Sequence, residues 1–317
     1  MAAGVVGLLA PGVAAAHPQT TLDPKTSAAE EITDLWWFML ITSTVVVMIV
    51  VTLTLLAVLR RRGRADAAAR FLGRQGLVSL GGLVVPIAIL SVLFALTLET
   101  LQETAPAHVH PELTIEVEGE QWFWNVRYPE AGAITANEIH VPTRTPVEIR
   151  VRTKDVLHSF WAPQLNRKID LLPGRPNRLT FVVNEPGRYR GQCAEYCGLQ
   201  HANMAFTVVA QEPAEFEAWL ANEADPAREP PPAVFMDSGC AACHTIRGSE
   251  AQGKVGPDLT HFAGREFLAA RTLENTRGDL GGWILDPQGV KPGTRMPGTE
   301  LDGEELDQLL DYLESLR

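Results

Sequence analysis

Two long apolar segments stand out in the pattern of hydrophobic and polar residues along the chain. They cover residues 36–59 and 75–98, and each holds about 24 residues without a charged side chain. Because about 20 apolar residues cross the hydrocarbon core of a bilayer, both segments are predicted to be transmembrane helices within a hairpin over residues 17–106. A buried hairpin in a soluble protein is the alternative interpretation.

The segment between the two apolar runs, residues 60–74, is strongly basic. It carries six arginines against a single acidic residue, Asp66. Arginine-rich loops remain on the cytoplasmic side of a membrane, so both ends of the hairpin are predicted to face outward. This asymmetry argues against the buried hairpin.

The first residues of the chain form a separate apolar segment. Residues 2–16 are small and apolar and end in Ala14-Ala15-Ala16 before His17. This pattern predicts an export signal over residues 1–16 with an A-x-A cleavage site, although no Lys or Arg precedes the apolar run. A short, loosely packed helix is the alternative.

Beyond Glu103 the pattern changes to short runs that are broken by Pro and Gly. Residues 113–117 and 147–152 alternate between apolar and polar side chains, and residues 179–183 form a further run before a turn at 184–187. Alternation with a period of two predicts strands. We therefore expect a β-sandwich over residues 107–212.

The remainder of the chain is predicted to be helical. Residues 213–232 are a short amphipathic helix that starts at Pro213, followed by a proline-rich linker, and residues 233–317 are a second domain. Asp302 and Glu305 form a capping-box pattern at the start of the last helix. The apolar stripe of that helix consists of Leu306, Leu309, Leu310 and Leu313.

Charge and cysteine content narrow the classes of function. The chain has 38 acidic and 27 basic residues, a net charge of -11, and most of the acidic excess follows residue 98. An acidic surface disfavours nucleic acid and suits a basic electron-transfer protein. The four cysteines form two pairs, Cys193 with Cys197 and Cys240 with Cys243, and each pair lies in a motif typical of a cofactor site.

The first pair belongs to a segment rich in soft metal ligands, residues 191–204. Thiolate and thioether donors beside imidazole select copper over hard cations. Two thiols four residues apart can bridge two copper ions. A structural disulfide between Cys193 and Cys197 is the main alternative, and zinc is disfavoured because zinc sites rarely recruit Met.

The spacing C-x-E-x-C-x-x-x-H-x-x-M resembles the dinuclear copper A site of cytochrome c oxidase subunit II and of nitrous oxide reductase. Residues 155–160 resemble the D-V-x-H-S-F pattern of the same family. The resemblance implies a cupredoxin-like sandwich and a magnesium ion reached by the Glu195 side chain at the interface with subunit I. The copper ligands that it implies are His158, Cys193, the backbone carbonyl of Glu195, Cys197, His201 and Met204.

Two further segments resemble the same family. Residues 119–124 match a G-x-Q-W-x-W stretch whose aromatic rings lie beside the copper pair, which implies that Trp122 is the electron-entry residue. Packing of these rings in the sandwich core is the alternative. Residues 168–175 match a segment associated with the contact to the catalytic subunit.

The second cysteine pair lies in Cys240-Ala241-Ala242-Cys243-His244, the C-x-x-C-H signature of covalent haem c attachment. Residues 236–239 and 256–259 resemble class I cytochromes c. Met296 is the only methionine after the motif and is predicted to be the distal iron ligand opposite His244, with His261 as the rival. A zinc or redox C-x-x-C site is the alternative.

The order of these parts resembles subunit II of a caa-type cytochrome c oxidase over nearly the whole chain. The resemblance implies electron transfer from haem c to copper A and on to subunit I, where O2 is reduced and protons are translocated. The implied partners are subunit I, subunit III, and external cytochrome c or a quinol–cytochrome c reductase as donor. The implied location is a bacterial cell membrane, with both cofactor domains on the outer side.

One position departs from the family pattern. The family often carries a Glu seven residues before a Pro at the mouth of a proton path, and counting back from Pro86 gives Ser79. No carboxylate occurs between Asp66 and Glu99. Two alternatives therefore stay open: a copper A-bearing nitric oxide reductase subunit, and a membrane-anchored electron carrier without a catalytic partner.

Overall fold

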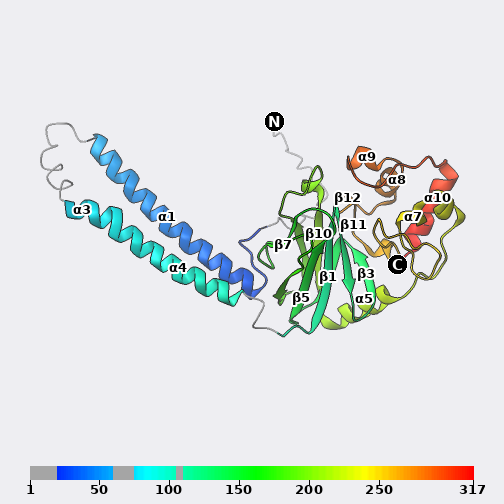
Figure 1. The fold of residues 1–317 in the computed structure, drawn as a ribbon, viewed down its shortest axis with the longest axis horizontal. Helices are drawn as coiled ribbons and strands as arrows, with labels where there is room; N and C mark the ends of the chain where they lie inside the picture. The colour runs from blue at the N-terminus through cyan, green and yellow to red at the C-terminus, as the bar shows by residue number, and fades with distance from the viewer. Residues whose placement is uncertain (1–19, 60–74, 105–109) are drawn as a thin grey trace, which may run out of the picture.

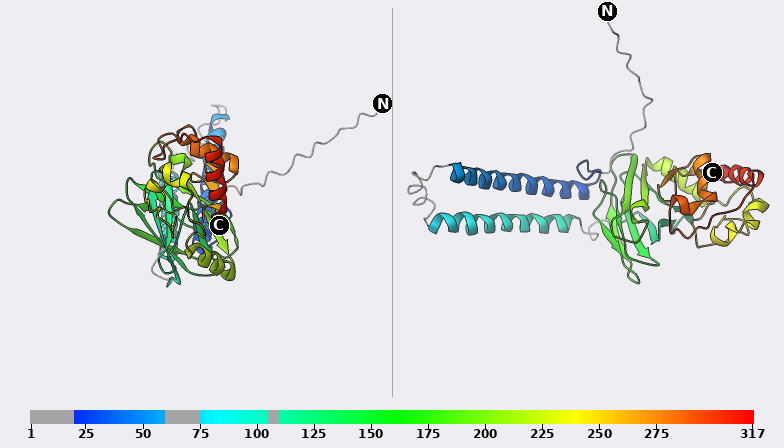
Figure 2. Two further views of the ribbon diagram at one scale, coloured as in Figure 1. Left: turned by 90° about the vertical axis from the view of Figure 1, so that its right-hand side faces the viewer. Right: turned by 90° about the horizontal axis from the view of Figure 1, so that it is seen from above.

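The computed structural model describes residues 20–59, 75–104 and 110–317. The predicted signal over 1–16 and the predicted cytoplasmic loop 60–74 lie outside the described residues. Three parts follow one another along the long axis of the molecule (Figure 1): a helical hairpin, a β-sandwich and a C-terminal helical domain. The same order is visible from above in Figure 2. The predicted fold class, a multidomain membrane protein with these three parts, is confirmed.

The hairpin consists of α1 (Ser27–Leu59) and a second rod formed by α3 (Gln75–Ser79), the π-helix η2 (Leu80–Val84) and α4 (Val85–Glu103). Both rods are long and apolar enough to cross a membrane. Over the predicted spans, residues 36–59 and 75–98, apolar side chains occur on all faces, and the described ones are mostly exposed. A helix that is hydrophobic all round needs an apolar environment, which supports the predicted membrane spans.

Helix α1 begins nine residues before the predicted span because its first turn is anchored on the sandwich. The Thr26 hydroxyl accepts a hydrogen bond from the Ala29 amide (3.1 Å) and donates one to the Leu165 carbonyl (2.6 Å). A threonine that satisfies a free amide of the first turn is a favourable N-terminal residue. The contact also links the membrane hairpin to the sandwich.

The sandwich contains two five-stranded sheets, ordered β3-β2-β1-β5-β8 and β4-β10-β9-β6-β7. The strands are β1 (Leu113–Glu120), β2 (Phe123–Tyr128), β3 (Ala133–Ala136), β4 (Glu138–Pro142), β5 (Val147–Thr153), β6 (His158–Trp161), β7 (Ile169–Leu171), β8 (Asn177–Phe181), β9 (Gly187–Cys193) and β10 (Ala205–Gln211). The core contains Trp124, Phe160 and Phe206, all fully buried. The two phenylalanine rings are stacked at 4.5 Å.

The strand predicted over residues 179–183 is displaced by two residues, since β8 ends at Phe181. Its neighbour β5 begins at Val147, which lies opposite Phe181. Val182 and Val183 therefore lie beyond the end of the ladder, and the Val183 carbonyl instead accepts a hydrogen bond from the Arg144 amide (2.8 Å). The sequence pattern that predicted this strand therefore extends two residues beyond the last residue of β8 that pairs with β5.

The helix predicted after Pro213 is present as α5 (Pro213–Ala224) and packs against the sandwich. Phe216 is buried, and the Trp219 ring is stacked on the His140 imidazole at 3.8 Å. His140 Nδ1 also lies 2.8 Å from the Gln211 side-chain oxygen. His140 thus has a packing role in this region.

The C-terminal domain contains α6 (Ala233–Asp237), α7 (Cys240–Cys243), η5 (Phe262–Gly264), the hairpin β11 (Phe267–Leu268) and β12 (Leu273–Glu274), α8 (Arg277–Leu285), α9 (Pro287–Val290) and α10 (Gly303–Ser315). The predicted capping box is confirmed, with Asp302 and Glu305 exchanging side-chain and backbone hydrogen bonds. Leu309, Leu310 and Leu313 of α10 are buried in the core of this domain. The hairpin β11–β12 lies on the side of this domain that is next to the sandwich (Figure 1).

Gly191 in β9 is required by the close approach of a core ring. A methyl group at this position would lie 2.2 Å from the ring of buried Phe206. We expect Gly191→Ala to lower the free energy of unfolding of the sandwich by about 1–3 kcal/mol, the usual cost of overpacking. Denaturant titration followed by tryptophan fluorescence measures it. Gly264→Ala, which has open space around it, is the control, and equal stability of both variants would contradict the prediction.

Candidate functional site

The soft ligands predicted from the sequence converge at one end of the sandwich. Strand β6 is antiparallel to β9, with Phe160 opposite Cys193, so that His158 is a diagonal neighbour of Cys193. His158 Nδ1 lies 3.7 Å from Cys193 Sγ, and both side chains are buried. The two sulfur atoms of Cys193 and Cys197 are 3.8 Å apart.

The remaining predicted ligands come from the loop after β9. The carbonyl oxygen of Glu195 is 3.2 Å from Cys193 Sγ. On the other side of the cluster, Cys197 Sγ is 3.7 Å from His201 Nδ1 and 3.8 Å from Met204 Sδ. All six predicted copper ligands therefore lie in one cluster, and His158, Cys193 and Cys197 are recognisable as a metal-binding group by geometry alone.

The chemistry of this cluster fits a copper pair. Both cysteines are free thiols, contrary to the alternative of a structural disulfide. The hydrogen bond from Cys197 lowers the pKa of the Cys193 thiol to about 4, and the same contact raises the pKa of Cys197. The pair thus holds one thiolate and one proton, and a bound cation replaces the proton because a coordinating thiol is deprotonated.

Asp155 holds the imidazole of His158 in place. Its Oδ1 lies 2.9 Å from His158 Nε2, and its carboxylate also accepts the backbone amides of Gln121 (2.8 Å) and Val156 (2.7 Å). Burial alone would raise the pKa of Asp155, but these hydrogen bonds lower it below its ordinary value. An ionised carboxylate directs the other imidazole nitrogen, Nδ1, toward the cysteines.

Trp122 lies between the copper loop and the C-terminal domain. Its indole Nε1 donates to the Cys197 carbonyl (3.0 Å), and only 8% of its surface is exposed. On its other side, a Cβ atom placed on Gly293 would lie 3.5 Å from the ring. Trp124, in contrast, is a fully buried core residue. The core-packing interpretation thus holds for Trp124, whereas Trp122 lies at the contact between the two domains.

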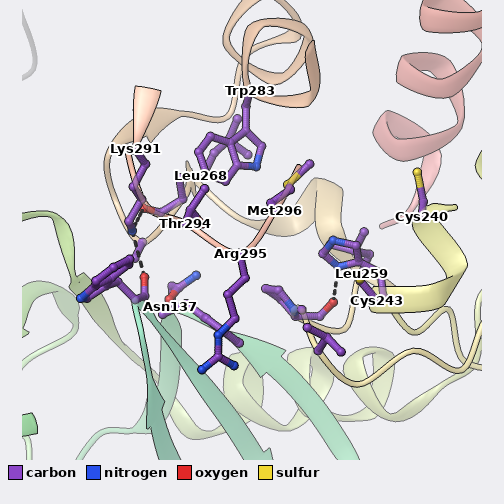
Figure 3. Close-up of a pocket in the computed structure, with 18 of the residues that line it drawn as sticks. Asn137, Cys240, Cys243, Leu259, Leu268, Trp283, Lys291, Thr294, Arg295 and Met296 are labelled. Carbon is purple, nitrogen blue, oxygen red and sulfur yellow. Dashed lines mark hydrogen bonds between the residues drawn. The ribbon is translucent and has the colours of Figure 1, made fainter. Parts of the chain in front are cut away.

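A cavity lies between the C-terminal domain and the sandwich. It measures about 1160 Å³, including space open to solvent, and its lining is mainly apolar. It contains the predicted haem-binding residues Cys240, Cys243, His244 and Met296. In Figure 3, Met296 lies between Trp283 and the segment that carries Cys240 and Cys243.

The cavity has features that fit a haem. His244 Nδ1 lies 2.8 Å from the Pro257 carbonyl, which fixes the ring and leaves Nε2 as the ligand atom for iron. Arg265, almost fully buried, lines the cavity, and its Nε has no hydrogen-bond partner. A buried guanidinium can pair with the acidic groups of a haem. His261 instead contacts the Asp225 carbonyl through Nε2 (2.9 Å) and does not line the cavity.

Some residues of this region were not predicted from the sequence. The sandwich residues Gln121 and Asn137 line the haem cavity together with Trp122. Lys291, which follows α9, is 2% exposed and bonds to carbonyl groups of both domains. Burial lowers the pKa of Lys291 to about 7. No local pattern marks these residues, because their roles arise from contacts between distant segments.

The fold and the two clusters define a class: a membrane-anchored electron-transfer protein with a copper domain and a cytochrome c domain. Residues 134–211 match the family of the cytochrome c oxidase subunit II periplasmic domain, and residues 232–317 match the cytochrome c family. The chain belongs to the cytochrome c oxidase subunit 2 family. It is therefore a subunit of a haem-copper oxidase, and copper A and haem c are its cofactors.

Three relatives illustrate the match. Cytochrome c oxidase subunit 2 of Alkalihalophilus pseudofirmus is 34% identical over 247 residues, which are 74% of this chain and 71% of the relative. The subunit of Bacillus sp. strain PS3 is 29% identical over 284 residues, 81% of this chain and 79% of the relative. The crystal structure of the periplasmic domain of subunit II from Bradyrhizobium japonicum is 32% identical, with a TM-score of 0.35, and the match covers 36% of this chain and 95% of that domain.

The Asp155 carboxylate gives a prediction for metal affinity. Asp155→Asn removes the negative charge that orients His158 and should weaken copper binding by about 10- to 100-fold. Competition with a calibrated copper chelator measures the change. Asp170→Asn, at an exposed position of β7, should bind copper as the unmodified chain does. Equal affinity in both variants would show that Asp155 does not orient the ligand.

The two clusters should respond to substitution independently. Cys197→Ser removes one of the two sulfur atoms proposed to hold the copper pair and should abolish the copper absorption bands while the haem bands persist. Met296→Leu should leave the copper bands intact and lower the haem potential, since a thioether ligand raises it. Absorption spectra and redox titration of both variants test this, and retained copper in Cys197→Ser would refute the assignment.

Proposed function

We propose that this chain passes electrons from its own haem c to its dinuclear copper A centre and on to subunit I, where O2 is reduced to water with proton translocation. The observation that carries this proposal is the position of Trp122. Its side chain lines the haem cavity and also donates a hydrogen bond to the carbonyl of Cys197. One residue thus contacts both candidate cofactor sites.

The proposed ligands follow from the two clusters. Cys240 and Cys243 would hold the haem covalently, and His244 and Met296 would supply the ligands of its iron. The copper pair, when bound, would supply one-electron redox chemistry. The residues proposed to hold the copper are His158, Cys193, the Glu195 carbonyl, Cys197, His201 and Met204. Trp122 is the proposed entry residue for electrons, and the Glu195 side chain is a ligand for interfacial magnesium.

The protein contributes rigidity to this process. His158 and Cys193 lie on neighbouring strands whose register is set by a buried core, and Asp155 fixes the imidazole. Ligands held by a rigid frame move little when the charge of the site changes, which keeps the reorganisation energy low. The indole N–H of Trp122 and the side-chain amide of Gln121 (2.6 Å) both hold the Cys197 carbonyl.

The chain is anchored in the membrane, with its oxidase domain of the periplasmic type. We infer further that residues 1–16 are an export signal, that residues 60–74 are cytoplasmic, and that the units are 17–106, 107–212, 213–232 and 233–317. Membership of an oxidase implies partner subunits such as subunit I. Subunit III and an external cytochrome c or a quinol–cytochrome c reductase are further proposed partners.

Reduction of nitric oxide remains a second candidate because of the second span. Ser79 ends α3 where the family often has a Glu, and no carboxylate occurs between Asp66 and Glu99. A proton supply through this span therefore lacks its usual acid. Subunit I is the proposed source of protons for the oxidase.

Gas consumption by the purified complex distinguishes these functions. The complex is isolated through a tag on this chain and supplied with reduced cytochrome c, and O2 and NO are tested separately. We expect cyanide-sensitive oxygen uptake that Cys197→Ser abolishes. NO turnover with little oxygen uptake would identify the reductase, and a chain that purifies alone without activity would be an electron carrier serving another acceptor.

A further inference from the structure

Lys291 is a buried positive charge at the contact between the two cofactor domains. Its Nζ atom lies within hydrogen-bonding distance of three backbone carbonyls: Trp122 (2.9 Å), Asn203 (2.7 Å) and Ala269 (2.8 Å). The first two belong to the sandwich and the third to the C-terminal domain. Lys291 therefore connects two loops of the copper domain with a turn of its own domain.

The three carbonyls match the donor capacity of an ammonium group. Protonated lysine has three N–H donors and no acceptor, and the neutral amine has only two donors. Burial favours the neutral amine, but the neutral amine could donate to only two of the three carbonyls at a time. The three charge-assisted hydrogen bonds of the ammonium form oppose the desolvation of the charge. Such a buried contact is screened by salt much less than a pair of surface charges.

A strained turn strengthens the same contact. Ala269, Ala270 and Arg271 have consecutive positive φ angles of 48°, 58° and 62°. Residues with a Cβ atom adopt this conformation at a cost, and it persists only where surrounding contacts impose it. Here the Ala270 carbonyl accepts the amide of Ala205, and the Arg271 guanidinium donates to the Thr207 hydroxyl. The turn between β11 and β12 is therefore shaped by its contact with β10.

Charged groups complete the contact at its edge. The Glu138 carboxylate of β4 accepts the amide of Glu266 (2.8 Å), and the Glu266 side chain pairs with Arg188 of β9 (2.6 Å). In addition, the Gln200 side-chain amide of the copper loop donates to the Pro292 carbonyl (2.8 Å), next to Lys291. These contacts join the C-terminal domain to β4, β9 and the copper loop of the sandwich.

We propose that Lys291 is a positioning residue that locks the cytochrome domain onto the copper domain, so that haem and copper exchange electrons in one fixed, docked arrangement. The locked arrangement covers Trp122, and an external electron donor therefore has to reach the haem domain rather than the copper domain. The consequence for an external donor rests on the proposed function, in which electrons pass from haem to copper. The contact between the two domains through Lys291 does not depend on that electron path.

Lys291→Met in the full chain tests the lock, because methionine keeps most of the side-chain volume and removes all three donors. Hydrogen–deuterium exchange should show faster exchange in residues 269–275 and 200–206. Transfer from photoreduced haem to copper should slow by about tenfold or more, since losing even one of the three charge-assisted hydrogen bonds would weaken the docked state by about that factor. The absorption spectra of both cofactors should remain those of the unmodified chain, because Lys291 is not a proposed ligand of either. Lys254→Met, at an exposed position of the same domain, should change none of these quantities.

Three outcomes would overturn the inference. Unchanged exchange and transfer in Lys291→Met would show that the lysine does not hold the domains together. Altered copper or haem spectra would show that it supports a cofactor site instead. A strong decrease of transfer with salt in the unmodified chain would indicate an encounter between charged surfaces.

A second variant covers the case in which Lys291→Met does not fold. Arg271→Ala removes the hydrogen bond to Thr207 and should raise exchange in the same two segments, and unchanged exchange would overturn the docking role of the turn. Exchange is measured without turnover. If the unmodified chain shows protected segments but no transfer from haem to copper, the proposed function fails while the lock stands.

Discussion

The hydrogen bond between the Trp122 indole and the Cys197 carbonyl is the contact on which the functional arrangement depends. It fixes the loop that carries four of the six proposed copper ligands, and it fixes an aromatic ring against the haem cavity. Because the carbonyl is also held by Gln121, its position is determined from two directions. Copper loop, aromatic ring and haem domain are thereby connected through a short series of direct contacts.

This arrangement needs a rigid base, and the sandwich provides it. The stacked rings of Phe160 and Phe206 fill the core directly behind the metal cluster, and Gly191 permits this close packing. A well-packed core resists the displacement of its side chains. The same packing that stabilises the fold therefore holds the copper ligands in place between oxidation states.

Because the cytochrome domain is part of the same chain, the haem does not have to reach the copper domain by diffusion. A tethered domain meets its acceptor at a high effective concentration, and a buried contact around Lys291 goes further by selecting one orientation. The acidic residues on the exposed surface of α10, among them Asp307, Asp311 and Glu314, are not part of this contact; they surround Arg277 of α8. The contact with the copper domain thus depends on the hydrogen bonds of Lys291, whereas these acidic residues form ion pairs within the cytochrome domain.

Much of the fold and most of the candidate ligands could be predicted from the sequence, because their signals are local. Apolar length predicts the two spans, and alternation predicts β1 and β5. The spacing of Cys193, Cys197, His201 and Met204 is that of one loop around one site. The end of β8 was misplaced, since a strand ends where its neighbour ends.

What the sequence determined by itself is the set of chemical groups: two soft-ligand motifs, a membrane anchor, and their order. Tertiary structure alone decided how those groups meet. The positions of His158 against Cys193, of Trp122 between two domains, and of Lys291 among three carbonyls depend on contacts between segments that are far apart in the chain. Carbonyl acceptors exist at every residue, so no side-chain pattern indicates which of them a buried lysine will bind.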